Sequence, residues 1–101
     1  MNNISSLDHI AINVSNIENS IEWYTRELNA SIIYRDKTWC LLSIANTKIA
    51  LTIKDEHPPH VGFLIKEFSK NHIDKVKKHR DNTEYVYISD IDGNIIELIK
   101  R

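Results

Sequence analysis

The stretch "LDHIAINV", residues 7–14, decides the fold because its side chains alternate between two faces. This alternation has the two-residue period of a β-strand. One face is apolar and is formed by Ile10, Ile12 and Val14; the other holds Leu7, His9, Ala11 and Asn13. The stretch therefore predicts a strand that carries a histidine on its less apolar face.

A helix and three further strands are expected directly after it. Ser15 and Glu18 have the spacing of a capping box, and Asn29, which tolerates the left-handed conformation, is the expected helix end. Between them the apolar residues recur at helical spacing, at Ile17, Ile21, Tyr24 and Leu28. Three β-rich runs follow at residues 31–34, 39–45 and 48–53, and Pro58 and Pro59 close the block.

The same order then starts again at "HVGFLI", residues 60–65, where His60 lies opposite the apolar face. A second helix containing Ile73 and Val76 is expected next, with a basic end at residues 77–80 and with His72 and His79 in solvent. Two strands, "EYVYISD" and "NIIELIK", follow and are joined by a turn at residues 92–94. The sequence thus contains a weak internal duplication of strand, helix and strands.

Length and charge restrict the function classes. The 101 residues predict a single domain, 1–101, with one module at about residues 5–55 and another at about 59–101. Thirteen Lys and Arg against fourteen Asp and Glu give a charge of −1, which indicates neither a nucleic-acid partner nor a membrane partner. The single cysteine, Cys40, cannot form an intrachain disulfide, so a reducing, cytoplasmic location is expected.

Four segments in this order resemble the vicinal oxygen chelate superfamily, which includes glyoxalase I, extradiol dioxygenases, fosfomycin-resistance enzymes and bleomycin-binding proteins. The segments are "LDHIAINV", "SIEWYTREL" with the following Asn29, "HVGF" and "DIDGNIIEL". The resemblance implies an α+β fold, in which two βαβββ modules form a curled mixed sheet around a cleft. It also implies a homodimer that acts on a small-molecule substrate.

The resemblance further implies that His9, His60 and Glu97 bind a divalent metal, because they match the family's ligand positions on the first, fifth and last strands. Alternation along each strand agrees, since each of the three lies opposite apolar neighbours. Two imidazoles and a carboxylate suit Fe(II), Mn(II), Ni(II) or Zn(II) and leave positions open for two adjacent substrate oxygens. Glu97 and Tyr87 are the expected catalytic residues, with Tyr87 as a substrate contact or an acid, or else as a packing residue.

Two features depart from the family pattern. Ala50 stands where glyoxalase I supplies a fourth ligand, and few residues remain between the second helix and Tyr85, so the second module is expected to be shortened. The leading hypothesis is a metal-dependent lyase, dioxygenase or transferase. The alternatives are a metal-free dimeric protein that sequesters a drug or metabolite, and an accessory domain whose shortened module binds another protein.

Overall fold

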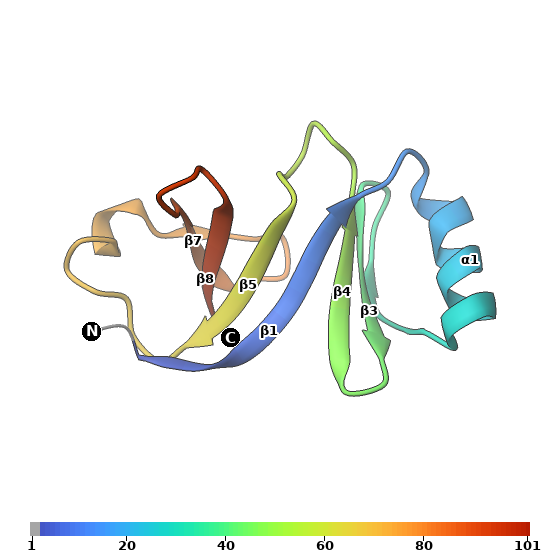
Figure 1. The fold of residues 1–101 in the computed structure, drawn as a ribbon, viewed down its shortest axis with the longest axis horizontal. Helices are drawn as coiled ribbons and strands as arrows, with labels where there is room; N and C mark the ends of the chain where they lie inside the picture. The colour runs from blue at the N-terminus through green and yellow to red at the C-terminus, as the bar shows by residue number, and fades with distance from the viewer. Residues whose placement is uncertain (1–2) are drawn as a thin grey trace. The chain divides into compact units, whose positions relative to one another are not determined.

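The computed structural model describes residues 3–101, in which eight β-strands, one α-helix and one 3₁₀ turn are formed (Figure 1). Two compact units make up the chain: residues 9–59, and residues 3–8 together with residues 60–101. Strand β1 (Ile4–Asn13) contributes its first half to the second of these units and its second half to the first. No helix within residues 3–101 has the length and apolar character needed to cross a membrane.

In the unit of residues 9–59 the strand order is β2-β3-β4-β1. Strands β2 (Ser31–Arg35), β3 (Trp39–Ile44) and β4 (Thr47–Thr52) pair in antiparallel fashion, and β1 pairs with β4 in parallel. Helix α1 (Ile17–Leu28) packs on β3 and β4 (Figure 1). The strands expected from the three β-rich runs are therefore confirmed.

Helix α1 has capping residues at both ends. Asn16 caps the N-terminus by accepting a hydrogen bond of 2.9 Å from the backbone N–H of Asn19, so the predicted capping box of Ser15 and Glu18 is wrong by one residue. Asn29 ends the helix in the left-handed conformation, with φ of 54°, as predicted. Buried Ile17 and Ile21 join the apolar core under the helix.

Strand β3 is buried on both faces. Cys40 and Leu42 point to the core under α1, whereas Trp39 and Leu41 belong to a separate apolar cluster on the opposite face. This second cluster also contains Ala11 and Ala50, and the partly buried Tyr34 packs against it. The first unit is thus held by two apolar layers, one on each side of its sheet.

In the second unit the strand order is β1-β5-β8-β7-β6. Strand β5 (His60–Ile65) pairs in parallel with β8 (Ile95–Lys100), which pairs in antiparallel fashion with β7 (Glu84–Ser89). A loop joins β7 to β8; in it the Asp90 carboxylate accepts from the backbone N–H groups of Asp92 and Asn94, and Gly93 has a φ of 85°. Ile65, Val86 and Leu98 form the buried centre of this unit.

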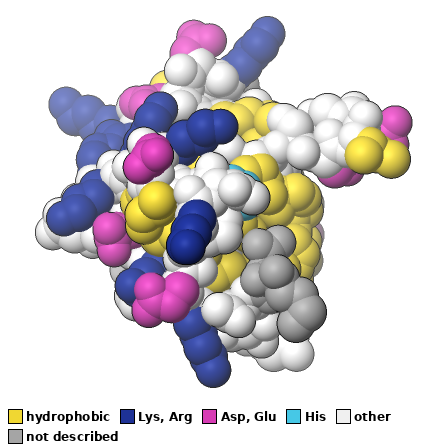
Figure 2. All heavy atoms as spheres, turned by 90° about the vertical axis from the view of Figure 1, so that its left-hand side faces the viewer, with side chains coloured by type: hydrophobic (Ala, Val, Ile, Leu, Met, Phe, Trp, Pro, Cys, Tyr) yellow, Lys and Arg dark blue, Asp and Glu magenta, His cyan; other side chains and the backbone are white. Residues whose placement is uncertain are grey.

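The second predicted helix is wrong. Residues Ile73–Lys75 form only a 3₁₀ turn, and Lys77–Lys78 form β6, a two-residue strand at the end of the order. Ile73 is 54% exposed, so this segment has no buried apolar stripe to stabilise an α-helix. The lysines of β6 are exposed at the sheet edge, and Figure 2 shows that side chains of both charge signs are interspersed on the face turned to the viewer.

The fold class predicted from the sequence is confirmed. The first unit follows the βαβββ order, and the second repeats it with its helix reduced to a 3₁₀ turn and with a very short β6. This reduction agrees with the expected shortening of the second module. Residues 77–83 consequently form the short edge strand β6 and the turn after it instead of a helix.

Candidate metal centre

Glu97 is a charged residue in the middle of a buried strand. It is 1% exposed, and Leu98 and Ile99 beside it on β8 are also buried. Across the sheet it lies opposite Gly62 on β5 and opposite Tyr87 on β7. Burial of a carboxylate is costly without polar partners, so the groups around Glu97 indicate its role.

His60 is the first of these partners. It precedes Gly62 by two residues on the same face of β5, and Gly62 carries no side chain that would separate it from Glu97. The distance from His60 Nε2 to Glu97 Oε1 is 3.4 Å, and both side chains are buried. The structure therefore brings together two of the three predicted metal ligands.

This pair fits a divalent metal. Two ligand atoms bonded to one ion at about 2.1 Å are about 3.0–3.4 Å apart, for bond angles between octahedral and tetrahedral values. The observed separation of 3.4 Å lies at the upper end of that range. Imidazole nitrogen with carboxylate oxygen is also a donor set that Fe(II), Mn(II), Ni(II) and Zn(II) accept.

His79 is a second histidine at Glu97, and the prediction that it lies in solvent is wrong. Its Nε2 is 2.6 Å from Glu97 Oε2, and its side chain is 13% exposed. The error came from the predicted helix, on which His79 would have been an exposed last-turn residue. In the structure His79 follows β6 by one residue, and the pairing of Lys77 with Tyr85 brings this segment alongside β7.

Two tyrosines of β7 surround the histidines. The ring of His79 stacks on that of Tyr85 at 3.6 Å, and the ring of His60 lies 5.1 Å from that of Tyr87. Burial raises the pKa of both phenols, and the negative charge of Glu97 raises it further. Tyr87 therefore remains a neutral hydrogen-bond donor that releases its proton with difficulty.

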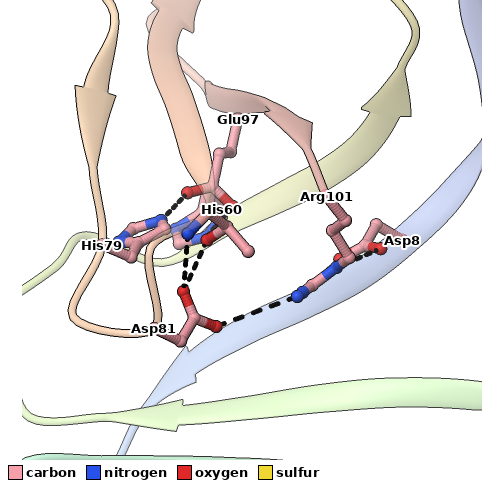
Figure 3. A network of polar contacts seen from close by, with 7 residues as sticks. Asp8, His60, His79, Asp81, Glu97 and Arg101 are labelled. Atoms are coloured by element: carbon pink, nitrogen blue, oxygen red, sulfur yellow. Dashed lines mark hydrogen bonds and ion pairs between the residues drawn. The ribbon is translucent and has the colours of Figure 1, made fainter.

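The Glu97 cluster consists of Glu97, His60 and His79. A second polar group lies next to it and is formed by Asp8, Asp81 and Arg101 (Figure 3). Two hydrogen bonds of 2.9 Å join the Arg101 guanidinium to the Asp8 carboxylate, and a third nitrogen of Arg101 is 3.9 Å from Asp81 Oδ2. The Asp8 hydrogen bonds raise the pKa of Arg101. This group connects β1, β8 and the turn after His79, and no sequence motif indicated it.

Two other positions that the resemblance matches to metal-ligand positions, His9 and Ala50, lie in the unit of residues 9–59. His9 is 4% exposed and follows Asp8 directly in β1, so the third predicted ligand is buried as expected for a ligand. Ala50 lies in the apolar cluster of Ala11, Trp39 and Leu41. Ala50 is therefore buried among apolar side chains and offers no ligand atom of its own.

Comparisons with known proteins agree with the fold and with the resemblance. Residues 6–73 match the family model of the Glyoxalase/Bleomycin resistance protein/Dioxygenase superfamily. A metallothiol transferase FosB from Staphylococcus epidermidis is 29% identical over 115 aligned positions, covering 94% of this chain and 81% of the relative.

Solved structures of methylmalonyl-CoA epimerases share the fold. The enzyme from Mycobacterium tuberculosis has a TM-score of 0.82 at 17% identity, over 99% of this chain and 90% of that chain. A variant of the Streptomyces coelicolor enzyme in complex with 2-nitronate-propionyl-CoA has a TM-score of 0.78 at 12% identity, over 96% and 97% of the two chains. With the family model matching two thirds of its residues, this chain belongs to the glyoxalase/bleomycin resistance protein/dioxygenase superfamily.

Proposed function

We propose that this protein is a metal-dependent enzyme in which His9, His60 and Glu97 hold a divalent ion that chelates two adjacent oxygens of a small substrate. The observation that carries the proposal is the buried pair of His60 and Glu97, whose ligand atoms are 3.4 Å apart. A carboxylate that is 1% exposed beside two imidazoles is expected at a metal site and is costly elsewhere. The bound ion would supply Lewis-acid stabilisation of negative charge that develops on a substrate oxygen.

His9 is proposed as the third ligand on the basis of its strand and its burial. It is a buried side chain that offers an imidazole nitrogen, and it continues β1 directly after Asp8. Asp8 is fixed by its two hydrogen bonds to Arg101, the residue that follows the last strand. The backbone entering His9 is therefore held in place, as a ligand-bearing position requires.

Tyr87 is proposed to contact the substrate. Its ring lies 5.1 Å from that of His60, and its raised pKa keeps the hydroxyl protonated. A neutral phenol in a buried setting can donate a hydrogen bond to a substrate oxygen. Burial and the neighbouring Glu97 charge oppose formation of the phenolate, which argues against a proton-donating role.

The reaction class is proposed to be group transfer. The relative from Staphylococcus epidermidis is named a metallothiol transferase and covers 94% of this chain. Within the first unit Ala50 offers no side chain that could act as a ligand or a base, which argues against proton shuttling of the glyoxalase I kind. A thiol substrate and a small electrophile with adjacent oxygens are therefore the first substrates to test.

Metal binding is the direct test. Isothermal titration of metal-free protein with Zn(II), Mn(II), Ni(II) and, under anaerobic conditions, Fe(II) should show one site that His60→Ala and Glu97→Gln abolish. At 100 times Kd the bound ion should stabilise the wild type by about 2.7 kcal/mol, seen as a higher Tm. His72→Ala is the matched control, since His72 contacts Ser69 rather than the Glu97 cluster. Equal affinities in all four proteins would contradict the proposal.

The second candidate function is a metal-free homodimer that binds a small molecule. The homodimer is supported by Ile32 and Ile33, which are both exposed on β2, the strand at one end of the sheet. Apolar residues on an unpaired strand edge are typical of a surface that pairs with another chain. A sedimentation experiment on wild type and Ile33→Lys tests the homodimer, and a monomeric wild type would exclude it.

A further inference from the structure

His79 contacts a different oxygen of Glu97 from the one that His60 approaches. Its Nε2 lies 2.6 Å from Oε2 of the carboxylate, whereas His60 Nε2 lies 3.4 Å from the other oxygen, Oε1. When Glu97 is ionised its carboxylate has only acceptors, so we assign the donor role in this contact to Nε2–H of His79. The two histidines therefore approach opposite oxygens of one carboxylate, and His79 is the closer of the two.

The position of the His79 ring is fixed from two directions. On one side it stacks on Tyr85, with the ring planes 4° from parallel. On the other side its backbone closes a turn, since the His79 N–H donates to Thr83 O and its carbonyl accepts from the Asn82 N–H, each at 2.9 Å. Asp81 ties the turn further by accepting two hydrogen bonds from Thr83.

The turn is also connected to the rest of its unit through charge. Asp81 Oδ2 is 3.9 Å from Arg101, whose guanidinium is held by buried Asp8 (Figure 3). His79 therefore lies on a restrained segment. Its ring is held by the stacking on Tyr85, so its Nε2 is kept directed toward Glu97. A group that orients a ligand from outside the coordination sphere needs this property.

We propose that His79 is a positioning residue that holds Oε2 of Glu97 and thereby presents Oε1, on the His60 side, to the metal. The inference rests on the proposed function and adds a residue that none of the family motifs in the sequence contains. His79 raises metal affinity by fixing the carboxylate and does not itself bind the ion. Loss of such an outer hydrogen bond typically weakens metal binding about 10–100-fold.

Two substitutions separate the hydrogen bond from the ring. His79→Phe keeps an aromatic ring for Tyr85 and removes the donor, whereas His79→Gln keeps an N–H donor at the corresponding place and removes the ring. Co(II) titration of the two variants and of wild type gives the affinity and, at saturation, the visible spectrum. We expect His79→Gln to bind close to wild type and His79→Phe to bind about 10–100-fold more weakly, with unchanged spectra at saturation.

The outcomes are distinct. Absence of metal binding in wild type would overturn the proposed function, and this inference with it. Wild-type affinity in His79→Phe, or weaker binding by His79→Gln than by His79→Phe, would overturn only this inference. A changed saturated spectrum in either variant would overturn it as well, because His79 would then be a ligand.

A measurement on the wild-type protein guards against misfolded variants. In a proton–nitrogen spectrum of the imidazoles, the Nε2–H of His79 should exchange slowly with water, and it should remain protonated when Zn(II) saturates the protein. Loss of this proton on metal binding would show coordination through Nε2 and would overturn the positioning role.

Discussion

Replacement of Arg101 by Met should destabilise the protein, because it leaves the Asp8 carboxylate buried without its guanidinium partner. The Asp8 side chain is 3% exposed and receives two hydrogen bonds of 2.9 Å from Arg101, whose own side chain is 29% exposed. Removal of one partner from a fully buried pair costs about 3–5 kcal/mol, and partial access of solvent to Arg101 lowers this to about 2–3 kcal/mol. For a domain of this size the loss corresponds to a fall in Tm of roughly 10–20 °C.

Urea denaturation at pH 7 of wild type, Arg101→Met, Asp8→Ala and the double variant measures the effect and its origin. Because the charge left behind is the source of the cost, the double variant should lose less stability than the two single losses combined. Arg26→Met is the matched control, since Arg26 pairs with Glu27 at the surface and should change stability by no more than about 0.5 kcal/mol. Losses that simply add, or a loss below about 0.5 kcal/mol for Arg101→Met, would refute the reasoning.

Three further predictions concern residues outside the Glu97 cluster. Asn29→Ala should cost about 1 kcal/mol in urea denaturation, since Asn29 has a φ of 54°, whereas Asn29→Gly should cost nothing; equal losses would contradict a conformational origin. Burial raises the pKa of the Cys40 thiol to about 11, so at pH 8 only about 0.1% is thiolate. Ellman's reagent should therefore react slowly with the native protein and quickly in denaturant, and fast native labelling would contradict this. Hydrogen bonds from the Asn94 side chain and from backbone N–H groups lower the pKa of Asp90, so its contribution to stability is present above the unfolded pKa of about 4 and is lost as the pH falls through the lower folded pKa. The difference in urea midpoint between wild type and Asp90→Ala should thus shrink from pH 7 to pH 2, and a pH-independent difference would argue against the carboxylate.

Local patterns in the sequence predicted most of the strands and two residues of the Glu97 cluster, His60 and Glu97. The alternation in residues 7–14 and 60–65 marked two strands, and the loop rich in Asp, Gly and Asn before residue 95 marked a hairpin. These features depend on neighbours only a few residues away, so they can be read from the chain itself. The same alternation placed His60 and Glu97 opposite apolar residues, on the faces where the structure brings them together.

Tertiary structure decided the features that depend on register and on distant contacts. His79 reaches Glu97 because Lys77 and Lys78, directly before it, pair with β7 instead of forming part of a helix. The exposed Ile73 left this segment without an apolar stripe to favour a helix. Gly62 lies opposite Glu97 only in the parallel register of β5 and β8, and that register leaves His60 beside the carboxylate. Asp8 and Arg101 are 93 residues apart, and only the folded sheet brings them together. The sequence by itself thus determined the elements and the faces on which their polar residues lie, whereas strand pairing determined which of those residues meet, because non-local contacts leave no local period.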